Sequence, residues 1–361
     1  MSKIKVTVLF GGMSGEHEVS LVSAASVIEA MDKDKYEIVE VGITEDGRFL
    51  AGENCLKKFK KKDYSDLEEV IFSMSKESKN RPDIIFPVLH GPYGEDGKIQ
   101  GFLDTLQIPY VGCNTLASST AMDKLQCKAI WEAAGLPVVP YVGFNRRAWR
   151  DESERKKILK DIEENLGLPL FVKPANMGSS VGITKVKKAE ELEAAIDLAA
   201  KFDRRILVEV GLNVREIECA VLGNDDTVAS PLGEVIVGGE FYDFYDKYVN
   251  GVSLTEIPAQ IDDELSERIK EMCLKAFKVL DCSGLSRVDS FVDKDSGEIY
   301  LNEINTMPGF TEISMYPKMM AEYGMEYSEL IDRLIELGLE RFKEEKEKQT
   351  SFESGSDWFK D

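Results

Sequence analysis

Two apolar runs late in the chain carry charged and amide side chains at a spacing that suits a metal site. Arg287 and Asp289 lie in the first run, Glu303 and Asn305 lie in the second, and a turn at 294–297 separates them. Such runs around a short loop that ends in glycine predict a β-hairpin. We expect Asp289 opposite Glu303 and Arg287 opposite Asn305, all on one face, because side chains alternate along a strand.

This face of the hairpin predicts a Mg²⁺ site. Facing carboxylates repel each other unless a cation lies between them, and Mg²⁺ prefers carboxylate and amide oxygens as ligands. The guanidinium of Arg287 suits a phosphate group or a developing oxyanion. A solvated polar face balanced by one arginine is the alternative.

Residues 171–182 are a second candidate site, in which a strand ends in a loop rich in glycine and serine. Lys173 lies at the end of the strand and Pro174 terminates it. The backbone N–H groups of the loop and the hydroxyls of Ser179 and Ser180 can approach phosphate oxygens, and the lysine supplies a positive charge. The segment is not a Walker A loop, and an ordinary flexible turn is the alternative.

Residues 207–211 and 215–218 are predicted to form consecutive strands with the features of a nucleoside site. The carboxylate of Glu216 can accept hydrogen bonds from both hydroxyls of a ribose. The backbone near Val210 and Leu212 can contact the edge of an adenine. Acidic residues on an exposed strand face are the alternative explanation.

Two other loops have compositions that suit binding. Residues 238–248 combine two glycines with several aromatic residues and one lysine, which is typical of a lid, although a buried aromatic strand is the alternative. Residues 11–18 precede a predicted helix and can bind an anion, or an ammonium group through Glu16. The lack of a G-x-G-x-x-G pattern argues against a dinucleotide site.

The composition restricts the possible metals and the number of domains. With 361 residues, 43% of them hydrophobic, the chain has material for two or three packed domains. With only two histidines, a histidine-rich metal centre is excluded, so a metal here is a hard, oxygen-liganded cation. The six cysteines show no C-x-x-C spacing, which indicates neither a zinc site nor a disulfide framework.

Charge and hydropathy restrict the partners. A net charge of −21 disfavours nucleic acid and anionic lipid, and an anionic substrate therefore requires a locally basic site. No run approaches the roughly 20 apolar residues of a membrane helix, and the N-terminus lacks a signal-peptide profile. We expect a cytoplasmic protein that contacts neither membrane nor nucleic acid.

The patterning predicts four parts. Residues 1–120 alternate strands and helices as a parallel α/β layer does, with glycine-rich loops at strand ends. Residues 121–210 are expected to form a smaller α+β unit. Residues 211–341 are richer in strands and end in a helix near 328–341. Residues 342–361 have the composition of a disordered tail.

Three long motifs, taken with these segments, resemble the D-alanine–D-alanine ligase family of the ATP-grasp superfamily. They are LFGGxSxEHxVS at 9–20, HGxxGEDGxxQG at 90–101 and NEINTMPGFT at 302–311. The likeness runs from about Val6 to Pro317. It implies an α/β and α+β protein, namely an ATP-grasp fold with an N-terminal Rossmann-like domain. It also implies a homodimer.

The resemblance implies an enzyme that uses ATP to join two D-alanine molecules for peptidoglycan precursors, through a D-alanyl phosphate. Two ions of Mg²⁺ or Mn²⁺ are expected at Asp289, Glu303 and Asn305. Arg287 would stabilise the tetrahedral transition state, and Glu16, Ser179 and Tyr248 would form a hydrogen-bonded triad that closes the lid. The expected ATP-binding residues are Lys124, Phe171, Lys173, Ser179, Ser180, Glu209, Val210, Leu212, Glu216, Phe241 and Lys247. The expected contacts to the amino acids are Glu16, His90, Lys247, Gly309, Ser314 and Met315.

The second substrate is less defined by the sequence. Relatives that make D-alanyl-D-lactate carry histidine near the position of Tyr248, so tyrosine favours the dipeptide. Met315 stands where other members carry leucine, and Ser286 and Ser290 replace apolar residues. A preference for D-serine therefore stays open. Outside this family, a non-catalytic nucleotide sensor and a nicotinamide-dependent oxidoreductase are the competing hypotheses.

Overall fold

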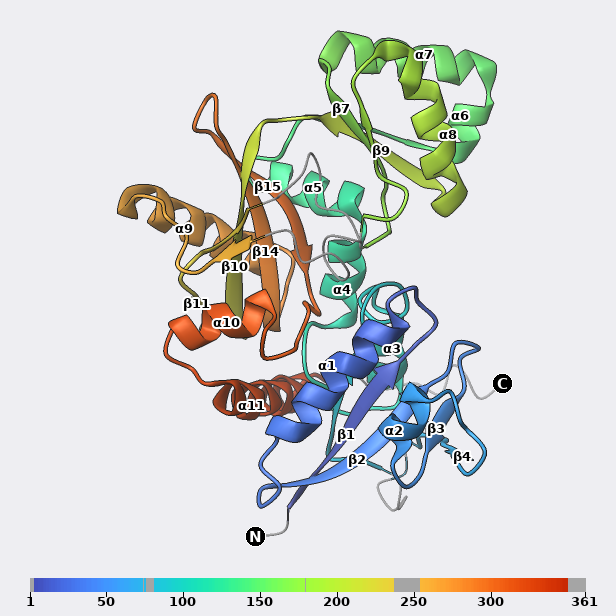
Figure 1. Ribbon diagram of the computed structural model, residues 1–361, viewed down its shortest axis with the longest axis vertical. Coiled ribbons are helices and arrows are strands. Elements are labelled where there is room, and N and C mark those ends of the chain that lie inside the picture. The colour runs from blue at the N-terminus through green and yellow to red at the C-terminus, as the bar shows by residue number, and fades with distance from the viewer. Residues whose placement is uncertain (1–2, 74, 76–80, 179, 237–253, 350–361) are drawn as a thin grey trace, which may run out of the picture.

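Strand β1 is the centre of the N-terminal sheet, whose order is β4-β3-β2-β1-β5 (Figure 1). It pairs in parallel with β2 and β5, and its apolar residues are buried. Helices cover such parallel strands because the strands carry apolar side chains on both faces. The computed structural model describes residues 3–73, 75, 81–178, 180–236 and 254–349. The N-terminal part contains β1 (Ile4–Gly11), α1 (His17–Ala30), β2 (Tyr36–Ile43), β3 (Phe49–Ala51), α2 (Cys55–Lys60), β4 (Glu68–Glu69), β5 (Ile84–Val88), α3 (Lys98–Thr105) and α4 (Thr115–Met122).

A small antiparallel sheet of order β6-β9-β7-β8 forms the second part, at the top of Figure 1. Helices α7 and α8 are amphipathic, and α8 packs its apolar face on this sheet around Val172, Ile196 and Val208. The elements are α5 (Lys124–Ala133), β6 (Tyr141–Asn145), α6 (Arg146–Arg150), α7 (Glu152–Asn165), β7 (Leu170–Pro174), β8 (Thr184–Val186), the 3₁₀ helix η1 (Ala189–Glu191), α8 (Leu192–Phe202) and β9 (Arg205–Val210).

The third sheet has the order β13-β12-β10-β14-β15, with β11 paired to β10. All its described pairings are antiparallel, and α9 packs against β10 and β14. Its elements are β10 (Val214–Gly223), β11 (Val228–Ala229), β12 (Gly233–Ile236), β13 (Leu254–Glu256), α9 (Asp263–Val279), β14 (Gly284–Asp293), β15 (Ile299–Asn305), α10 (Met315–Glu322) and α11 (Tyr327–Glu345).

The last helix, α11, packs against the N-terminal sheet although it follows the third sheet in the chain (Figure 1). Ile331 and Leu334 belong to the same buried cluster as Val6 and Val88. The hydroxyl of Tyr36 donates a hydrogen bond to the Asp332 carboxylate at 2.8 Å. The first and last parts of the chain therefore share one core.

The α/β and α+β character is as expected, and segments 207–211 and 215–218 belong to the consecutive strands β9 and β10, as predicted. These two strands lie in different sheets, because the chain passes from β9 to β10 through Gly211–Asn213. One local prediction differs from the structure. The last helix ends at Glu345 instead of near 341, so residues 342–345 are helical where a disordered tail was expected. An uninterrupted run of helix formers continues this helix.

Candidate active site

The hairpin of β14 and β15 has the predicted register at the residues expected to bind metal. Asp289 pairs with Glu303, and Arg287 pairs with Asn305. Nearer the turn the register differs by one residue, because a bulge follows Asp289 and makes Asn302 the extra residue on β15. Without the bulge, Asn302 would lie opposite Asp289. Bulges redirect side chains beside active sites, and this one brings the two carboxylates together.

Arg287 is surrounded by carboxylates. Its Nε and Nη2 atoms donate to Asp289 at 2.7 and 2.6 Å, and Nε lies 3.2 Å from Oε2 of Glu218. Burial lowers the pKa of Arg287, but Asp289 and Glu218 outweigh burial and hold that pKa well above its ordinary value. The sequence reasoning did not select Glu218, although its alternation with Glu216 on one strand was a usable signal.

The oxygens beside Arg287 fit a hard divalent cation. Asn305 Nδ2 donates to Asp289 Oδ2 at 3.0 Å, and Lys124 Nζ lies 3.3 Å from Glu303 Oε2. Two carboxylates and one amide thus converge from facing strands, which is the donor chemistry that Mg²⁺ prefers. Within the described residues, His, Cys, Asp and Glu alone form no group of three suited to a metal, so the amide is needed to complete the set.

A cavity of about 700 Å³ lies between the small sheet and the third sheet. Every described residue that was expected to bind ATP lines it. These residues are Lys124, Phe171, Lys173, Ser180, Glu209, Val210, Leu212 and Glu216. The lining includes Phe171 and Val210, which suit a base, and Lys124 and Lys173, which suit phosphates, as a nucleotide requires.

The lining of this cavity is not basic overall, contrary to the expectation for an anionic substrate. Its described residues include six lysines or arginines and eight aspartates or glutamates. The cations are instead placed singly between acidic side chains. An excess of carboxylates around a polyphosphate calls for divalent cations, which agrees with the donor set of the hairpin.

Lys124 is held in place by the first turn of α5. Asp123 caps this helix, since its Oδ1 accepts from the backbone N–H groups of Leu125 and Gln126 at 3.1 and 3.0 Å. Its Oδ2 accepts from Arg205 at 2.6 Å and from Asn176 at 3.0 Å. The cap therefore joins α5 to the loop that follows β7, whose glycines and serines were expected to contact phosphate.

One turn further along α5, Lys128 is a buried residue that the sequence reasoning missed. Its side chain is 1% exposed, and Nζ lies 3.2 Å from Oε2 of Glu209. Lys173 forms an ion pair with the other oxygen of the same carboxylate. Burial raises the pKa of Glu209, but the two ammonium groups outweigh burial and lower that pKa to about 2.

A second cavity, of about 950 Å³, lies between α1, the loop after β5 and the loop after β15. It is lined by Glu16, His90, Gly309, Ser314 and Met315, all of which were expected to contact the amino acids. The two cavities share several lining residues and so meet at one point. The shared residues are Lys124, Met177, Gly178, Glu218, Arg287 and Glu303.

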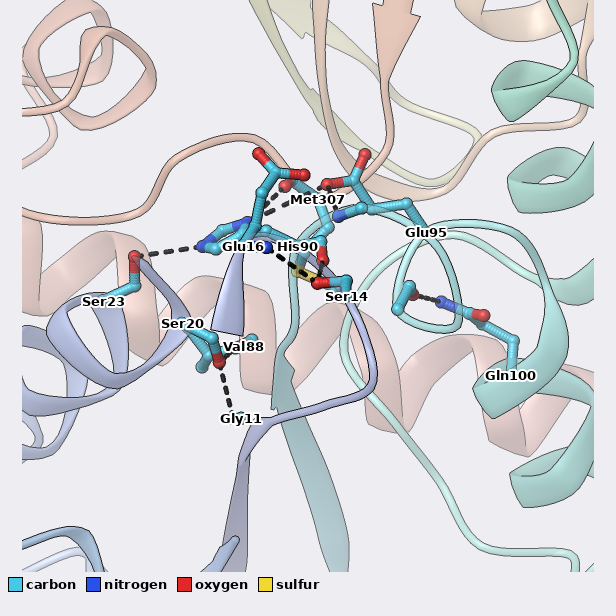
Figure 2. A network of polar contacts seen from close by, with 12 residues as sticks. Gly11, Ser14, Glu16, Ser20, Ser23, Val88, His90, Glu95, Gln100 and Met307 are labelled. Atoms are coloured by element: carbon cyan, nitrogen blue, oxygen red, sulfur yellow. Dashed lines mark hydrogen bonds and ion pairs between the residues drawn. The ribbon is translucent and has the colours of Figure 1, made fainter. Parts of the chain in front are cut away.

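His90 is fixed in its orientation by two hydrogen bonds (Figure 2). Its Nδ1 lies 3.1 Å from the carbonyl oxygen of Met307, so Nδ1 carries the proton and donates it. Nε2 then accepts from the hydroxyl of Ser23 at 3.0 Å. Burial lowers the pKa of His90 and outweighs the opposing effect of Glu16, so the ring is neutral near pH 7.

Glu16 lies close to two glycines that leave room for its carboxylate. A Cβ atom at Gly91 would be 2.5 Å from Glu16 Oε2, and one at Gly178 would be 3.5 Å from it. Nearby, the carboxylate of Glu95 accepts from the backbone N–H of Gly91 at 2.9 Å (Figure 2). Burial and then Glu16 raise the pKa of Glu95 well above its ordinary value.

At the far end of the second cavity, Ser314 precedes α10 and Met315 begins it. The Ser314 hydroxyl accepts from the backbone N–H of Thr311 at 3.1 Å. Ser286 and Ser290 do not line this cavity, so these two substitutions do not alter its wall as the sequence suggested. Their hydroxyls donate to backbone carbonyls of the third sheet. Ser179, Phe241, Lys247 and Tyr248 lie outside the described residues.

Two family models match the chain. The model described as "D-ala D-ala ligase N-terminus" matches residues 5–113, and the one described as "D-ala D-ala ligase C-terminus" matches residues 130–336. The chain belongs to the D-alanine–D-alanine ligase family. Family membership also shows the ATP-grasp fold with its N-terminal Rossmann-like part, in agreement with the three sheets.

Similar proteins cover the chain almost completely. The D-alanine–D-alanine ligase of Natranaerobius thermophilus is 48% identical, over 98% of this chain and 99% of its own length. The one of Chloroherpeton thalassium is 47% identical, over 96% and 99%. Among solved structures, the VanG D-Ala:D-Ser ligase of Enterococcus faecalis is 40% identical with a TM-score of 0.83, over 93% of this chain and 100% of that one. The D-alanine–D-alanine ligase of Coxiella burnetii is 33% identical with a TM-score of 0.83, over 96% and 97%.

Proposed function

We propose that this protein joins two molecules of D-alanine to D-alanyl-D-alanine at the expense of ATP. The observation that carries the proposal is the meeting of two cavities at Lys124, Arg287 and Glu303. One cavity has the features of a nucleotide site, and the other is lined by carboxylate, imidazole and hydroxyl groups that suit amino acids. The product is a precursor of peptidoglycan.

In the first step, the carboxylate oxygen of one D-alanine attacks the γ-phosphorus of ATP, and ADP leaves. Lys124 and Lys173 hold the phosphates, while Glu16 binds the ammonium group of the amino acid and His90 lies beside it. Catalysis of such a transfer rests mainly on positioning and charge neutralisation. Mg²⁺ or Mn²⁺, bound as two ions by Asp289, Glu303 and Asn305, supplies that neutralisation when present.

In the second step, the amine of the other D-alanine attacks the carbonyl carbon of the D-alanyl phosphate, loses a proton, and inorganic phosphate leaves. Arg287 lies at the junction of the cavities, where it can stabilise the oxyanion of the tetrahedral intermediate. Gly309, Ser314 and Met315 line the second cavity, and we expect Ser314 and Met315 to contact the carboxylate of this second substrate. Ser179, Phe241, Lys247 and Tyr248 keep the roles in ATP binding and lid closure that the resemblance implies.

The nucleoside part of ATP would lie against Phe171, Ser180, Val210 and Leu212, with Glu216 at the ribose. We propose that the chain is organised in parts at residues 1–120, 121–210 and 211–345, the last boundary being moved to the end of α11, and that residues 346–361 form the tail. Helix α11 then links the third part to the first. A homodimer and a cytoplasmic location complete the proposal, and no described helix has the length and apolarity to span a membrane.

Phosphate release from Mg·ATP tests the activity. We expect release with D-alanine alone and a dipeptide product by mass spectrometry. Absence of release with D-alanine under any condition would overturn the proposal. Omission of divalent cation is expected to abolish release, and so is Asp289→Asn. Electron paramagnetic resonance of Mn²⁺ with the wild type and with Asp289→Asn would show directly whether the hairpin binds the ion.

A D-alanyl-D-serine ligase is the second candidate, because the VanG D-Ala:D-Ser ligase is 40% identical to this chain. Met315 lines the second cavity and stands where other members carry leucine, so the pocket for the second substrate can differ. Competition between D-alanine and D-serine, with products identified by mass, distinguishes the two. A third arm with D-lactate tests the depsipeptide product, which the tyrosine at 248 disfavours.

A further inference from the structure

Glu209 lies between two lysines beneath the nucleotide cavity, and each lysine contacts a different oxygen of its carboxylate. Lys128 Nζ lies 3.2 Å from Oε2, and Lys173 pairs with Oε1. Lys128 and Glu209 are 1% and 2% exposed, so water does not solvate either charge. Lys128 also lies over the ring of Tyr141, with Nζ 5.6 Å from the ring centroid.

One cation is enough to neutralise one carboxylate, so the presence of Lys128 beside Glu209, in addition to Lys173, needs a separate explanation. Burying an ammonium group is costly unless the group is paired, and an apolar residue at 128 would avoid that cost. Burial lowers the pKa of Lys128 and outweighs the opposing effect of Glu209, which is a measure of this cost. Lys173, by contrast, lines the cavity and is placed to reach a ligand.

We propose that Lys128 is a positioning residue: it holds the Glu209 carboxylate so that Lys173 can leave Glu209 and bind the phosphates of ATP. The inference rests on the proposed function in one respect, namely that Lys173 contacts phosphate. When Lys173 turns to the nucleotide, Glu209 keeps Lys128 as its partner and is not left as a buried, unpaired charge. ATP binding then exchanges one ion pair for another.

In a variant that lacks Lys128, the side chains of Lys173 and Glu209 form a neutral ion pair. The pair itself is stable, so the fold is retained, but ATP has to break the pair and leave a buried carboxylate without a cation. Adenosine carries no phosphate and does not need Lys173. Loss of Lys128 is therefore expected to weaken binding of ATP and to leave binding of adenosine nearly unchanged.

Isothermal titration of the full-length protein with Mg·ATP and with adenosine tests this. For Lys128→Met we expect the dissociation constant of ATP to rise about tenfold and that of adenosine to change less than about twofold, as removal of one charge contact implies. Lys201→Met, which removes an exposed lysine of α8, is the matched control and should change neither constant. Equal losses for ATP and adenosine would show a merely structural role and overturn the proposal.

A double variant separates positioning from packing. Glu209→Gln in the Lys128→Met background removes the carboxylate that retains Lys173. The affinity for ATP should therefore recover by at least about threefold relative to Lys128→Met alone. Independent effects of the two substitutions would not give such a coupling. Additive losses would contradict the proposal.

Should Lys128→Met fail to fold, Lys128→Gln is the second variant, because it keeps a polar group beside Glu209 but removes the charge. ATP affinity should then also fall, while adenosine affinity changes less than about twofold. Equal losses for the two ligands, or no loss of ATP affinity, would overturn the proposal. These titrations read binding and not turnover, so a wild type that binds ATP but releases no phosphate with D-alanine would refute the proposed function alone.

Discussion

Arg287 shows how one side chain depends on its neighbours. It contacts both Glu218 and Asp289, and Asp289 is itself one of the expected metal ligands. Planar, paired donation to Asp289 fixes the direction of the guanidinium. Arg287 lines both cavities, and under the proposed function negative charge would develop on the carbonyl oxygen at their junction.

Arg287→Ala is expected to lower kcat by about 10²- to 10³-fold, because it removes a donor aimed at the oxyanion. The KM for D-alanine at the first site should change much less, since Glu16 and His90 are the residues proposed to contact that substrate. Arg287→Lys keeps the charge but loses the paired donation, and its kcat should also fall. Steady-state kinetics of the coupled ADP assay measures both parameters. Arg333→Ala, which removes a surface arginine of α11, is the control and should match the wild type.

His90 predicts a pH effect on stability. Burial lowers its pKa in the folded state below the ordinary 6.5, so only the unfolded chain takes up a proton as the pH falls through 6.5. The wild type should therefore lose about 1 kcal/mol of unfolding free energy relative to His90→Gln between pH 7.5 and 5.5. Urea unfolding at the two pH values measures the difference. A constant difference would contradict the neutral, buried imidazole.

The residues that sequence reasoning found and those it missed differ in one physical respect. Asp289, Glu303 and Asn305 could be placed on one face because alternation along a strand is a local rule. Lys128 gave no such signal, because a lysine four residues after another on a helix is typical of a solvated face. Its burial depends on Glu209, which is distant in the sequence and adjacent only in the fold.

Among the elements, α5 links the caps and loops around the nucleotide cavity. The sequence predicted the strand before the phosphate loop, but it could not predict that the cap residue Asp123 of α5 also binds Arg205 and Asn176. The bulge on β15 also could not be predicted from the sequence, since its position depends on the hydrogen-bond register of two strands and not on residue type. Element types follow from local patterns, and their mutual placement follows from such distant contacts.

Asp123→Ala tests whether a helix cap also positions the cavity. We expect a loss of about 1 kcal/mol in unfolding free energy, as for other caps, and in addition a several-fold rise in the KM for ATP, because Lys124 and the loop at Asn176 lose their common anchor. Asp151→Ala is a matched control, since Asp151 caps α7 through the backbone of Ser153 and Glu154 far from either cavity. It should lose similar stability and leave KM unchanged. Equal KM values for the two variants would refute a positioning role for the cap.

In the molecule as a whole, the last helix packs against the N-terminal sheet. Helix α11 fills the core beside β1 and β5, so the N-terminal sheet is completed by residues that are distant in the sequence (Figure 1). The small sheet has a separate core around Ile196, and Leu125 of α5 packs against its Leu207 in a smaller cluster. This arrangement favours relative motion of the small sheet and the nucleotide cavity beneath it, against a rigid remainder.

This division predicts different effects for two identical substitutions of fully buried isoleucines. Ile331→Ala in α11 should cost about 2–5 kcal/mol of stability and lower the hydrogen-exchange protection of β1 and β5 together with that of α11, because all three share one core. Ile196→Ala in α8 should cost a similar amount but lower protection only in β6 to β9 and α6 to α8, since these elements share a separate cluster. Exchange measured by mass spectrometry resolves these segments. If Ile331→Ala left β1 protected, the N-terminal sheet would be an independent folding unit, and α11 would be an attachment to it instead of part of its core.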